Sequence, residues 1–412
     1  MAVWPLAMSH ELVYLLLICG LLVVPGLLQR LRIPPPLTCF ALGITVILWL
    51  PPGNHSDVAV HLLAALGIST LFLYAGLEVD LGTLRQAVGP LSIYLLTRVL
   101  SIAAVAWLAA RYVGLTWRDA TLVALGLLTS STGFIIDSLD RYGLEPEERF
   151  WVTNNAISGE LLALAVMFVV LKATDPVGLG LATLALLATL AALPLALLAL
   201  GRWFIPYVSG CEFSMLVMIG FAAAFVTDAL GVEYLLGAFL AGLVARLLEN
   251  RVPQLASHDN LRAVKLFSSF FLPFYFFARG AHVPSDALSL EALAIGVGLT
   301  VVLVPLRAGS IWTKRRLLGI GNIRSSWRVA AALTPTLIFT LVLASLLRER
   351  GAITDELFGG MLLYAGLNTM LPSFVLRAAF DVAPVPARQG KQPVPARQGK
   401  QPVPAREPDQ AT

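Results

Sequence analysis

Charged residues are scarce in this chain. Lys, Arg, Asp and Glu make up 13% of its 412 residues, against 58% hydrophobic residues and a mean hydropathy of +0.80. Soluble domains carry about a quarter charged residues. The excess of apolar side chains therefore predicts a protein whose surface faces lipid.

Residues that build catalytic and metal sites are also sparse. The three cysteines, Cys19, Cys39 and Cys211, lie in or beside apolar stretches and lack the spacing of a zinc site or a disulfide framework. No HExxH or GxSxG motif occurs, and the five histidines fall in loops or at the ends of apolar segments. We therefore expect no enzyme activity, no cofactor and no nucleic-acid partner.

The apolar residues form long runs of Leu, Ala and Val, which indicate membrane-spanning helices. A helix needs about 20 apolar residues to cross a bilayer, and on this basis we predict an all-α polytopic membrane protein with about 13 transmembrane helices. The predicted spans are 10–28, 34–50, 57–77, 88–110, 119–139, 150–171, 177–200, 212–229, 233–248, 263–282, 288–312, 326–347 and 356–377.

Basic residues set the predicted orientation, because Lys and Arg concentrate in loops on the cytoplasmic side of a membrane. With an odd number of spans and an outside N-terminus, the basic clusters within 246–265 and 314–328 both face the cytoplasm. We therefore predict a multi-pass protein of the inner (plasma) membrane, with its N-terminus outside and its C-terminus in the cytoplasm.

Residues 381–412 differ in kind from the rest. The sequence PVPARQGKQ starts at Pro384 and at Pro393, and PVPAREPDQ follows at Pro402. A segment rich in Pro, Gln, Gly and basic residues cannot bury a core, so we expect a disordered tail. A weak contact of its basic residues with anionic lipid headgroups is the alternative.

The first six and the last six spans form two halves of opposite topology, the arrangement of inverted-repeat transporters. Span 5 contains Thr129-Ser130-Ser131-Thr132-Gly133, and its repeat mate, span 12, contains Thr334-Pro335-Thr336. Hydroxyl groups and glycine weaken a helix, and proline frees a carbonyl. Two interrupted helices in matching positions predict an ion site at the centre of the membrane, with ordinary packed kinks as the alternative.

Glu160 is the strongest candidate for the ion-binding group. It follows Arg149 by about eleven residues, which places it roughly 16 Å deep at 1.5 Å per residue. An isolated carboxylate is costly at that depth, so we expect it to face a cavity rather than to serve only as a structural contact. It can hold a proton or a cation but not both, and this competition would couple the two in an antiporter.

Other polar residues surround this candidate. Arg307 in span 11 is the predicted counter-charge, which either pairs with Glu160 or extends to the cytoplasmic surface. Asp137, just beyond the hydroxyl-rich segment, is a possible second carboxylate, with a solvated interfacial role as the alternative. Asn155 precedes Glu160 on the same helix and is assigned to the ion path. Arg98 in span 4 is assigned to structural pairing or snorkelling.

Four segments resemble monovalent cation:proton antiporters of the Kef/Nap type, within the sodium/hydrogen exchanger superfamily. In chain order they are FLYAGLEVDL at 72–81, Ser131-Thr132 before an aliphatic helix, LGAFLAGL at 236–243 and FLPFYFFARG at 271–280. The resemblance implies a homodimer in which each protomer has a core domain with two crossed, broken helices. The core would move against a dimerisation domain to give alternating access.

The resemblance also implies boundaries and a site. The transmembrane domain would be 1–380, with core spans about 88–171 and 288–377 and dimerisation or linker spans about 10–77 and 177–282. The family carries Asp-Asp or Asn-Asp at its ion site, whereas Gly159-Glu160 stands here. In the family a basic residue often follows the proline of the second broken helix, and Thr336 stands at that position here. The lysine that the family carries in the preceding span corresponds to Arg307. With one site carboxylate, exchange of one cation for one proton is the simplest prediction.

The leading functional hypothesis is exchange of Na⁺ or K⁺ for protons. One alternative is a sodium-coupled symporter of a small organic anion, in which Arg307 binds the substrate carboxylate. The other is a non-transporting membrane sensor with a vestigial ion site. An intact intramembrane Glu160 argues against the sensor.

Overall fold

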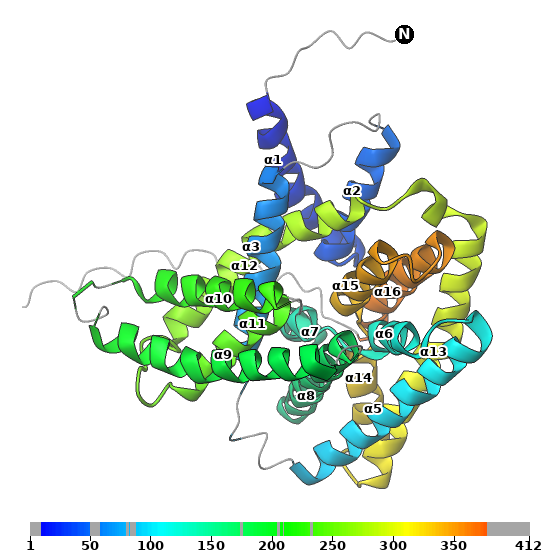
Figure 1. The fold of residues 1–412 in the computed structure, drawn as a ribbon. Helices are drawn as coiled ribbons and strands as arrows, with labels where there is room; N and C mark the ends of the chain where they lie inside the picture. The colour runs from blue at the N-terminus through cyan, green and yellow to red at the C-terminus, as the bar shows by residue number, and fades with distance from the viewer. Residues whose placement is uncertain are drawn as a thin grey trace, which may run out of the picture. The chain divides into compact units, whose positions relative to one another are not determined.

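The computed structural model describes residues 10–49, 58–79, 82, 88–173, 176–203, 207–208, 210–230 and 234–376. Within these ranges the chain is helical and contains no strand (Figure 1). The long helices are α1 (His10–Leu28), α2 (Pro35–Trp49), α3 (Val58–Leu77), α5 (Val88–Leu108), α6 (Trp117–Leu128), α7 (Thr132–Ser138), α8 (Pro146–Lys172), α9 (Pro176–Trp203), α10 (Glu212–Ala229), α11 (Tyr234–Leu247), α12 (His258–Gly280), α13 (Leu290–Leu317), α14 (Ile323–Ala332), α15 (Leu337–Glu349) and α16 (Asp355–Val375). Short helical turns are η1 (Gln29–Leu31), η2 (Ala109–Val113), η3 (Leu139–Tyr142) and η4 (Ser285–Leu288).

The prediction of an all-α polytopic membrane protein is confirmed. Each predicted span coincides with a helix or with a pair of consecutive helices. Among the described residues, nine helical segments are long and apolar enough to cross a membrane. α1 and α2 meet this condition only when they are taken together, and the chain bends by 120° between them. α11 is apolar but shorter than the nine segments. The count of thirteen spans therefore stays a prediction, and the repeat tail lies outside the described residues.

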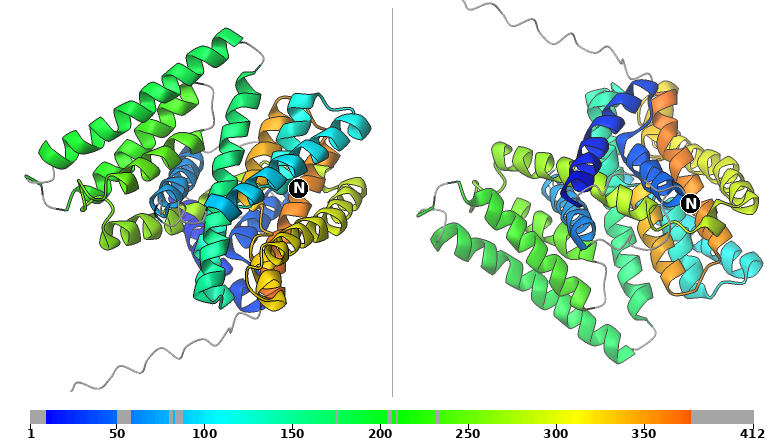
Figure 2. Two further views of the ribbon diagram at one scale, coloured as in Figure 1. Left: turned by 90° about the horizontal axis from the view of Figure 1, so that it is seen from below. Right: turned by 90° about the horizontal axis from the view of Figure 1, so that it is seen from above.

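The helices pack in two groups. In the first, α3 lies against α11 and α12, which in turn contact α10 and α2. In the second, α13 packs on α14 and α16, and α6 packs on α5 and α15. Figure 1 shows α9 to α12 gathered apart from α5, α6, α13 and α16, and both views in Figure 2 show the same separation. The division of the chain into core and dimerisation domains stays a prediction.

Two helices of the second group are interrupted where the sequence has hydroxyl groups or proline. α6 ends at Leu128 and α7 begins at Thr132, with Thr129 and Ser131 in extended conformation. α14 ends at Ala332 and α15 begins at Leu337, across the proline-containing segment. Pro335 has no N–H to donate, so a continuous helix would lose a hydrogen bond there.

Glycines let two helices of the first group approach closely. A Cβ atom on Gly76 in α3 would collide with the carbonyl oxygen of Phe239, and one on Gly242 in α11 would collide with that of Leu73. Small residues at a crossing allow membrane helices to pack backbone against backbone. Two of the segments that resemble the antiporter family therefore pack against each other, and their glycines serve helix contact.

Gly242→Ala should lower the melting temperature of the purified protein in detergent. The added methyl group forces α3 and α11 apart, and overpacking of this kind costs about 1–3 kcal/mol. Gly298→Ala is the matched control, because nothing lies within 4 Å of a Cβ added there and alanine favours a helix. Equal melting temperatures for the two variants would contradict the close contact.

Candidate functional site

The two interruptions meet and bond to each other. The backbone N–H of Ser131 donates to the carbonyl of Pro335 at 2.8 Å, and the N–H of Ile338 donates to Ser131 Oγ at 2.9 Å. Ser130 Oγ donates to the carbonyl of Leu333 at 2.7 Å. Helix ends leave backbone groups without partners, and lipid cannot supply any. Each break therefore supplies hydrogen-bonding partners that the other lacks.

Helix α16 completes this junction with two polar side chains. Tyr364 donates its hydroxyl to the carbonyl of Leu127 at 2.7 Å. Asn368 donates its amide to Thr336 Oγ1 at 2.9 Å and accepts from the backbone N–H of Thr336 at 3.3 Å. The sequence reasoning did not single out either residue. The available signal was a lone asparagine in the middle of an otherwise apolar span.

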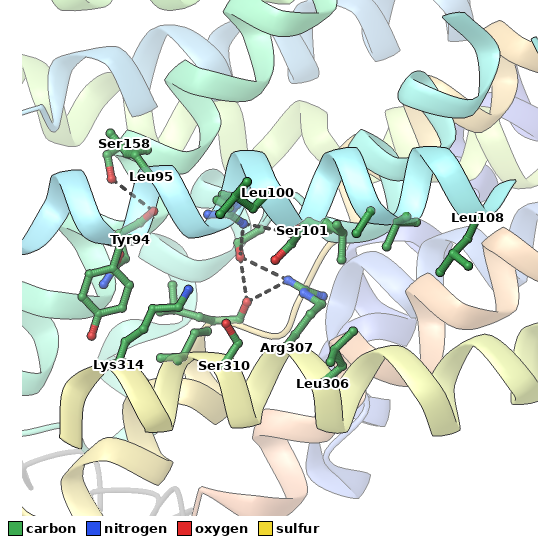
Figure 3. Close-up of a pocket in the computed structure, with 18 residues that line it drawn as sticks. Tyr94, Leu95, Leu100, Ser101, Leu108, Ser158, Leu306, Arg307, Ser310 and Lys314 are labelled. Atoms are coloured by element: carbon green, nitrogen blue, oxygen red, sulfur yellow. Dashed lines mark hydrogen bonds between the residues drawn. The ribbon is translucent and has the colours of Figure 1, made fainter. Parts of the chain in front are cut away.

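Arg307 binds the second break (Figure 3). Its side chain is 8% exposed, and both terminal nitrogens are used. The acceptors are the Thr334 carbonyl at 2.7 Å, the Tyr364 hydroxyl at 3.1 Å, Ser130 Oγ at 3.2 Å and the Leu333 carbonyl at 3.1 Å. The C-terminal end of a helix carries partial negative charge, so a cation beside the end of α14 is favourable.

Arg98 occupies the equivalent place at the first break. It extends from α5 and donates through Nη2 to the carbonyl of Leu128 at 2.8 Å and to Ser130 Oγ at 3.2 Å. The predicted pairing of Arg307 with Glu160 is absent from the described contacts, because Arg307 is held by the carbonyls of the break. The arginine that lies beside this part of α8 is Arg98, whose Nη1 packs against Gly159. The signal missed in the sequence was its position in span 4, the repeat mate of span 11.

Glu160 is buried beside the start of α7. Its side chain is 2% exposed and lies close to the backbone N–H and the hydroxyl of Thr132. Glu160 Oε2 has no hydrogen-bond partner among the described residues, and the same holds for Thr132 Oγ1, Asn155 Nδ2 and Thr129 Oγ1. Buried polar atoms nearly always have partners, so these atoms are candidates to bind a ligand.

The residue before Glu160 shows how the site differs from the resembling family. A Cβ atom on Gly159 would collide with Nη1 of Arg98. The guanidinium thus fills the space that an Asp or Asn side chain would need at this position. The local result is one buried carboxylate next to one fixed positive charge.

Asp137 lies away from this buried group. It is at the end of α7, is 45% exposed and pairs with Arg141 at 2.7 Å. It lines a cavity of about 370 Å³ between α2, α3, α7 and α12, together with Lys265 and with Gly133 near the start of α7. Asp137 is therefore placed along an approach to the break and is not brought together with Glu160.

Comparison with known proteins agrees with the membrane fold. The model of a family described as "Sodium/hydrogen exchanger, transmembrane" matches residues 14–380. A Methanocaldococcus jannaschii protein named "Probable Na(+)/H(+) antiporter 3" is 24% identical, over 90% of this chain and 97% of its own length. The "Na(+)/H(+)-K(+) antiporter GerN" of Bacillus cereus is 22% identical, over 82% of this chain and 87% of its own length.

A solved structure has the same fold. The sodium proton antiporter MjNhaP1 from Methanocaldococcus jannaschii, determined at pH 8, superimposes with a TM-score of 0.62. The match covers 89% of this chain and 95% of that chain, at 14% sequence identity.

Arg307→Gln should destabilise the purified protein strongly. The substitution removes the charged donor from the carbonyls of Leu333 and Thr334, and buried hydrogen bonds to charged groups contribute about 1.5–3 kcal/mol each. Arg316→Gln, an exposed arginine near the end of the same helix, is the control. The melting temperature in detergent should fall only for Arg307→Gln, and an unchanged value would show that the break does not depend on this arginine.

Proposed function

We propose that this chain, which belongs to the transmembrane sodium/hydrogen exchanger family, exchanges a monovalent cation, Na⁺ or K⁺, for protons at Glu160. The observation that carries the proposal is the buried Glu160 carboxylate, whose Oε2 lacks a partner among the described residues. A bare carboxylate in the membrane interior is costly, and either a proton or a cation removes that cost. Because both use the same oxygens, binding of one displaces the other.

The two arginines then serve as fixed supports rather than as proton carriers. Arginine stays protonated in proteins, so neither Arg98 nor Arg307 can release a proton. Both hold backbone carbonyls at the ends of broken helices, and this fixes the break beside Glu160. The hydrogen bonds of Arg307 also weigh against the symporter hypothesis, because its terminal nitrogens are engaged and not free for a substrate carboxylate.

We propose that transport proceeds by alternating access. The group containing α5 to α8 and α13 to α16 would move against the group containing α1 to α3 and α9 to α12. Support comes from the packing of the helices into these groups and from the cavity of about 370 Å³ that lies where α7 faces α2, α3 and α12. Movement at that boundary would change which side of the membrane reaches Glu160.

The assembly and the orientation are proposed on other grounds, the homodimer from the family resemblance and the orientation from the loop charges. We propose a homodimer in the inner membrane, with the N-terminus outside and the C-terminus in the cytoplasm, as the distribution of basic residues predicts. Na⁺ and K⁺ both remain candidates, since relatives carry the names of sodium antiporters and of a sodium and potassium antiporter.

Proteoliposomes loaded with a pH-sensitive dye test this function. A pH gradient is imposed, Na⁺, K⁺ or Li⁺ is added outside, and cation-dependent proton flux is recorded. We expect flux in the native protein and its loss in Glu160→Gln, which keeps the size of the side chain but cannot exchange a proton. Asp137→Asn is the matched control and should keep the flux, because Asp137 is solvated and paired with Arg141.

The outcomes discriminate between the hypotheses. Flux that survives Glu160→Gln would place the exchange elsewhere. An absence of flux with every cation, in vesicles shown to be sealed and to contain folded protein, would overturn antiport and leave the symporter or the sensor.

The stoichiometry gives a separate test. One buried carboxylate predicts one cation for one proton, so the exchange moves no net charge. Flux in the same vesicles should therefore be unchanged by an imposed membrane potential of either sign, whereas each net charge moved would couple to the potential by about 2.3 kcal/mol per 100 mV. A rate that follows the potential would require a second titrating group, and Asp137→Asn would then be expected to abolish that dependence.

A further inference from the structure

A second cavity, of about 390 Å³, lies between α5 and α13. Figure 3 shows its walls, with Tyr94 and Ser101 on α5 facing Arg307, Ser310 and Lys314 on α13. Ser130 and Asn155 of the candidate site reach its wall, whereas Glu160 and Asp137 are not among the lining residues. The cavity is therefore a different space from the approach to α7 described above.

All charged residues that line this cavity are basic. Arg98, Arg307 and Lys314 line it, and no Asp or Glu does. None of the three forms an ion pair within the described part of the chain. The two arginines are bonded to the breaks, while Lys314 Nζ lies 5.4 Å from the centre of the Tyr94 ring. Glu160 lies next to Arg98 but outside the lining, so the walls of the cavity carry three basic groups and no acidic one, and they favour an anion within it.

The polarity of the walls changes along the cavity. On α5, Tyr94, Arg98 and Ser101 line one part, and Val105 and Leu108 continue the same helical face. At 1.5 Å per residue, the distance from Tyr94 to Leu108 is roughly 21 Å. On α13, Lys314 and Ser310 lie beside the polar residues of α5, with Ile311 between them, and Arg307 and Leu306 lie further along (Figure 3). A ligand that fills both ends must be an amphiphile with an anionic head.

We propose that the cavity between α5 and α13 binds an anionic phospholipid, with its phosphate at Lys314 and an acyl chain along Val105, Leu108 and Leu306. The Lys314 end of α13 also carries Arg315 and Arg316, and the positive-inside rule assigns such a cluster to the cytoplasmic side. Anionic lipids are enriched in that leaflet, and basic pockets between membrane helices bind their headgroups. A small soluble anion would leave the apolar end of the cavity unfilled.

Native mass spectrometry of the delipidated protein tests the headgroup contact. The protein is titrated with phosphatidylglycerol and with phosphatidylcholine of the same acyl chains. We expect one phosphatidylglycerol per protomer to bind tightly and phosphatidylcholine to bind more weakly. Loss of one basic contact should weaken phosphatidylglycerol binding about fivefold in Lys314→Ala. Arg316→Ala, which removes the same charge from an exposed position two residues away, should bind as the native protein does.

A steric pair tests the acyl chain. Ala103 and Ala104 are both exposed, but only Ala104 lines the cavity. Ala104→Trp should remove the tightly bound lipid, and Ala103→Trp should retain it, with both variants first shown to be folded by their melting temperatures without lipid. If Ala104→Trp does not fold, Ala104→Phe replaces it.

The proposal fails if Lys314→Ala and Arg316→Ala bind alike, or if both tryptophan variants keep the lipid. It also fails if glycerol phosphate, a headgroup without chains, protects the protein against thermal unfolding as strongly as phosphatidylglycerol does. That result would identify a site for soluble anions. Because lipid binding is read without transport, the outcome is independent of whether Glu160 exchanges cations for protons.

Discussion

Two helices that stop inside a membrane leave backbone groups that only the protein itself can satisfy. Most of the polar contacts at the centre of this molecule follow from that constraint. The breaks lie against each other so that Ser131 can bond both Pro335 and Ile338. Arg98 and Arg307 reach from neighbouring helices to the free carbonyls, and α16 contributes a tyrosine and an asparagine to the same junction. The junction is polar because its backbone is unwound.

The same arrangement gives the buried carboxylate its setting. Glu160 lies beside the start of α7, where backbone N–H groups are exposed by the break, and next to the guanidinium that fills the space over Gly159. The Glu160 carboxylate lies next to the fixed positive charge of Arg98, which also donates a hydrogen bond to the carbonyl of Leu128. The proposed exchange of a proton for a cation would take place at this carboxylate. The junction of the two breaks and the buried carboxylate are thus parts of one structure.

Much of the fold follows from sequence pattern, since apolar runs of sufficient length form helices in any membrane protein. The sequence also predicted the positions of the breaks, because hydroxyl clusters and Pro335 weaken a helix whatever surrounds it. The sequence left two places open for Arg307, at Glu160 or at the cytoplasmic surface, and in the structure it binds the carbonyls of Leu333 and Thr334 instead. Depth along a helix and a correspondence with the family's lysine were the information available, and neither says which residues the side chain contacts. The glycines of the motifs illustrate the same limit, because Gly76 and Gly242 mark a helix contact that only their packing reveals.

The sequence by itself determined the helical membrane fold, the two interruptions, and the choice of Glu160 as an acidic residue placed deep in a span. These depend on local chemistry, on hydrophobicity summed along each segment and on backbone groups that proline or glycine alter directly. Only the tertiary structure decided which charges meet. Arg98, rather than Arg307, lies beside Glu160. Arg98 on α5 lines a cavity together with Arg307 and Lys314 on α13. Electrostatic and hydrogen-bonding partners depend on distances of a few ångströms between segments far apart in the chain, and no periodicity along the sequence records those distances.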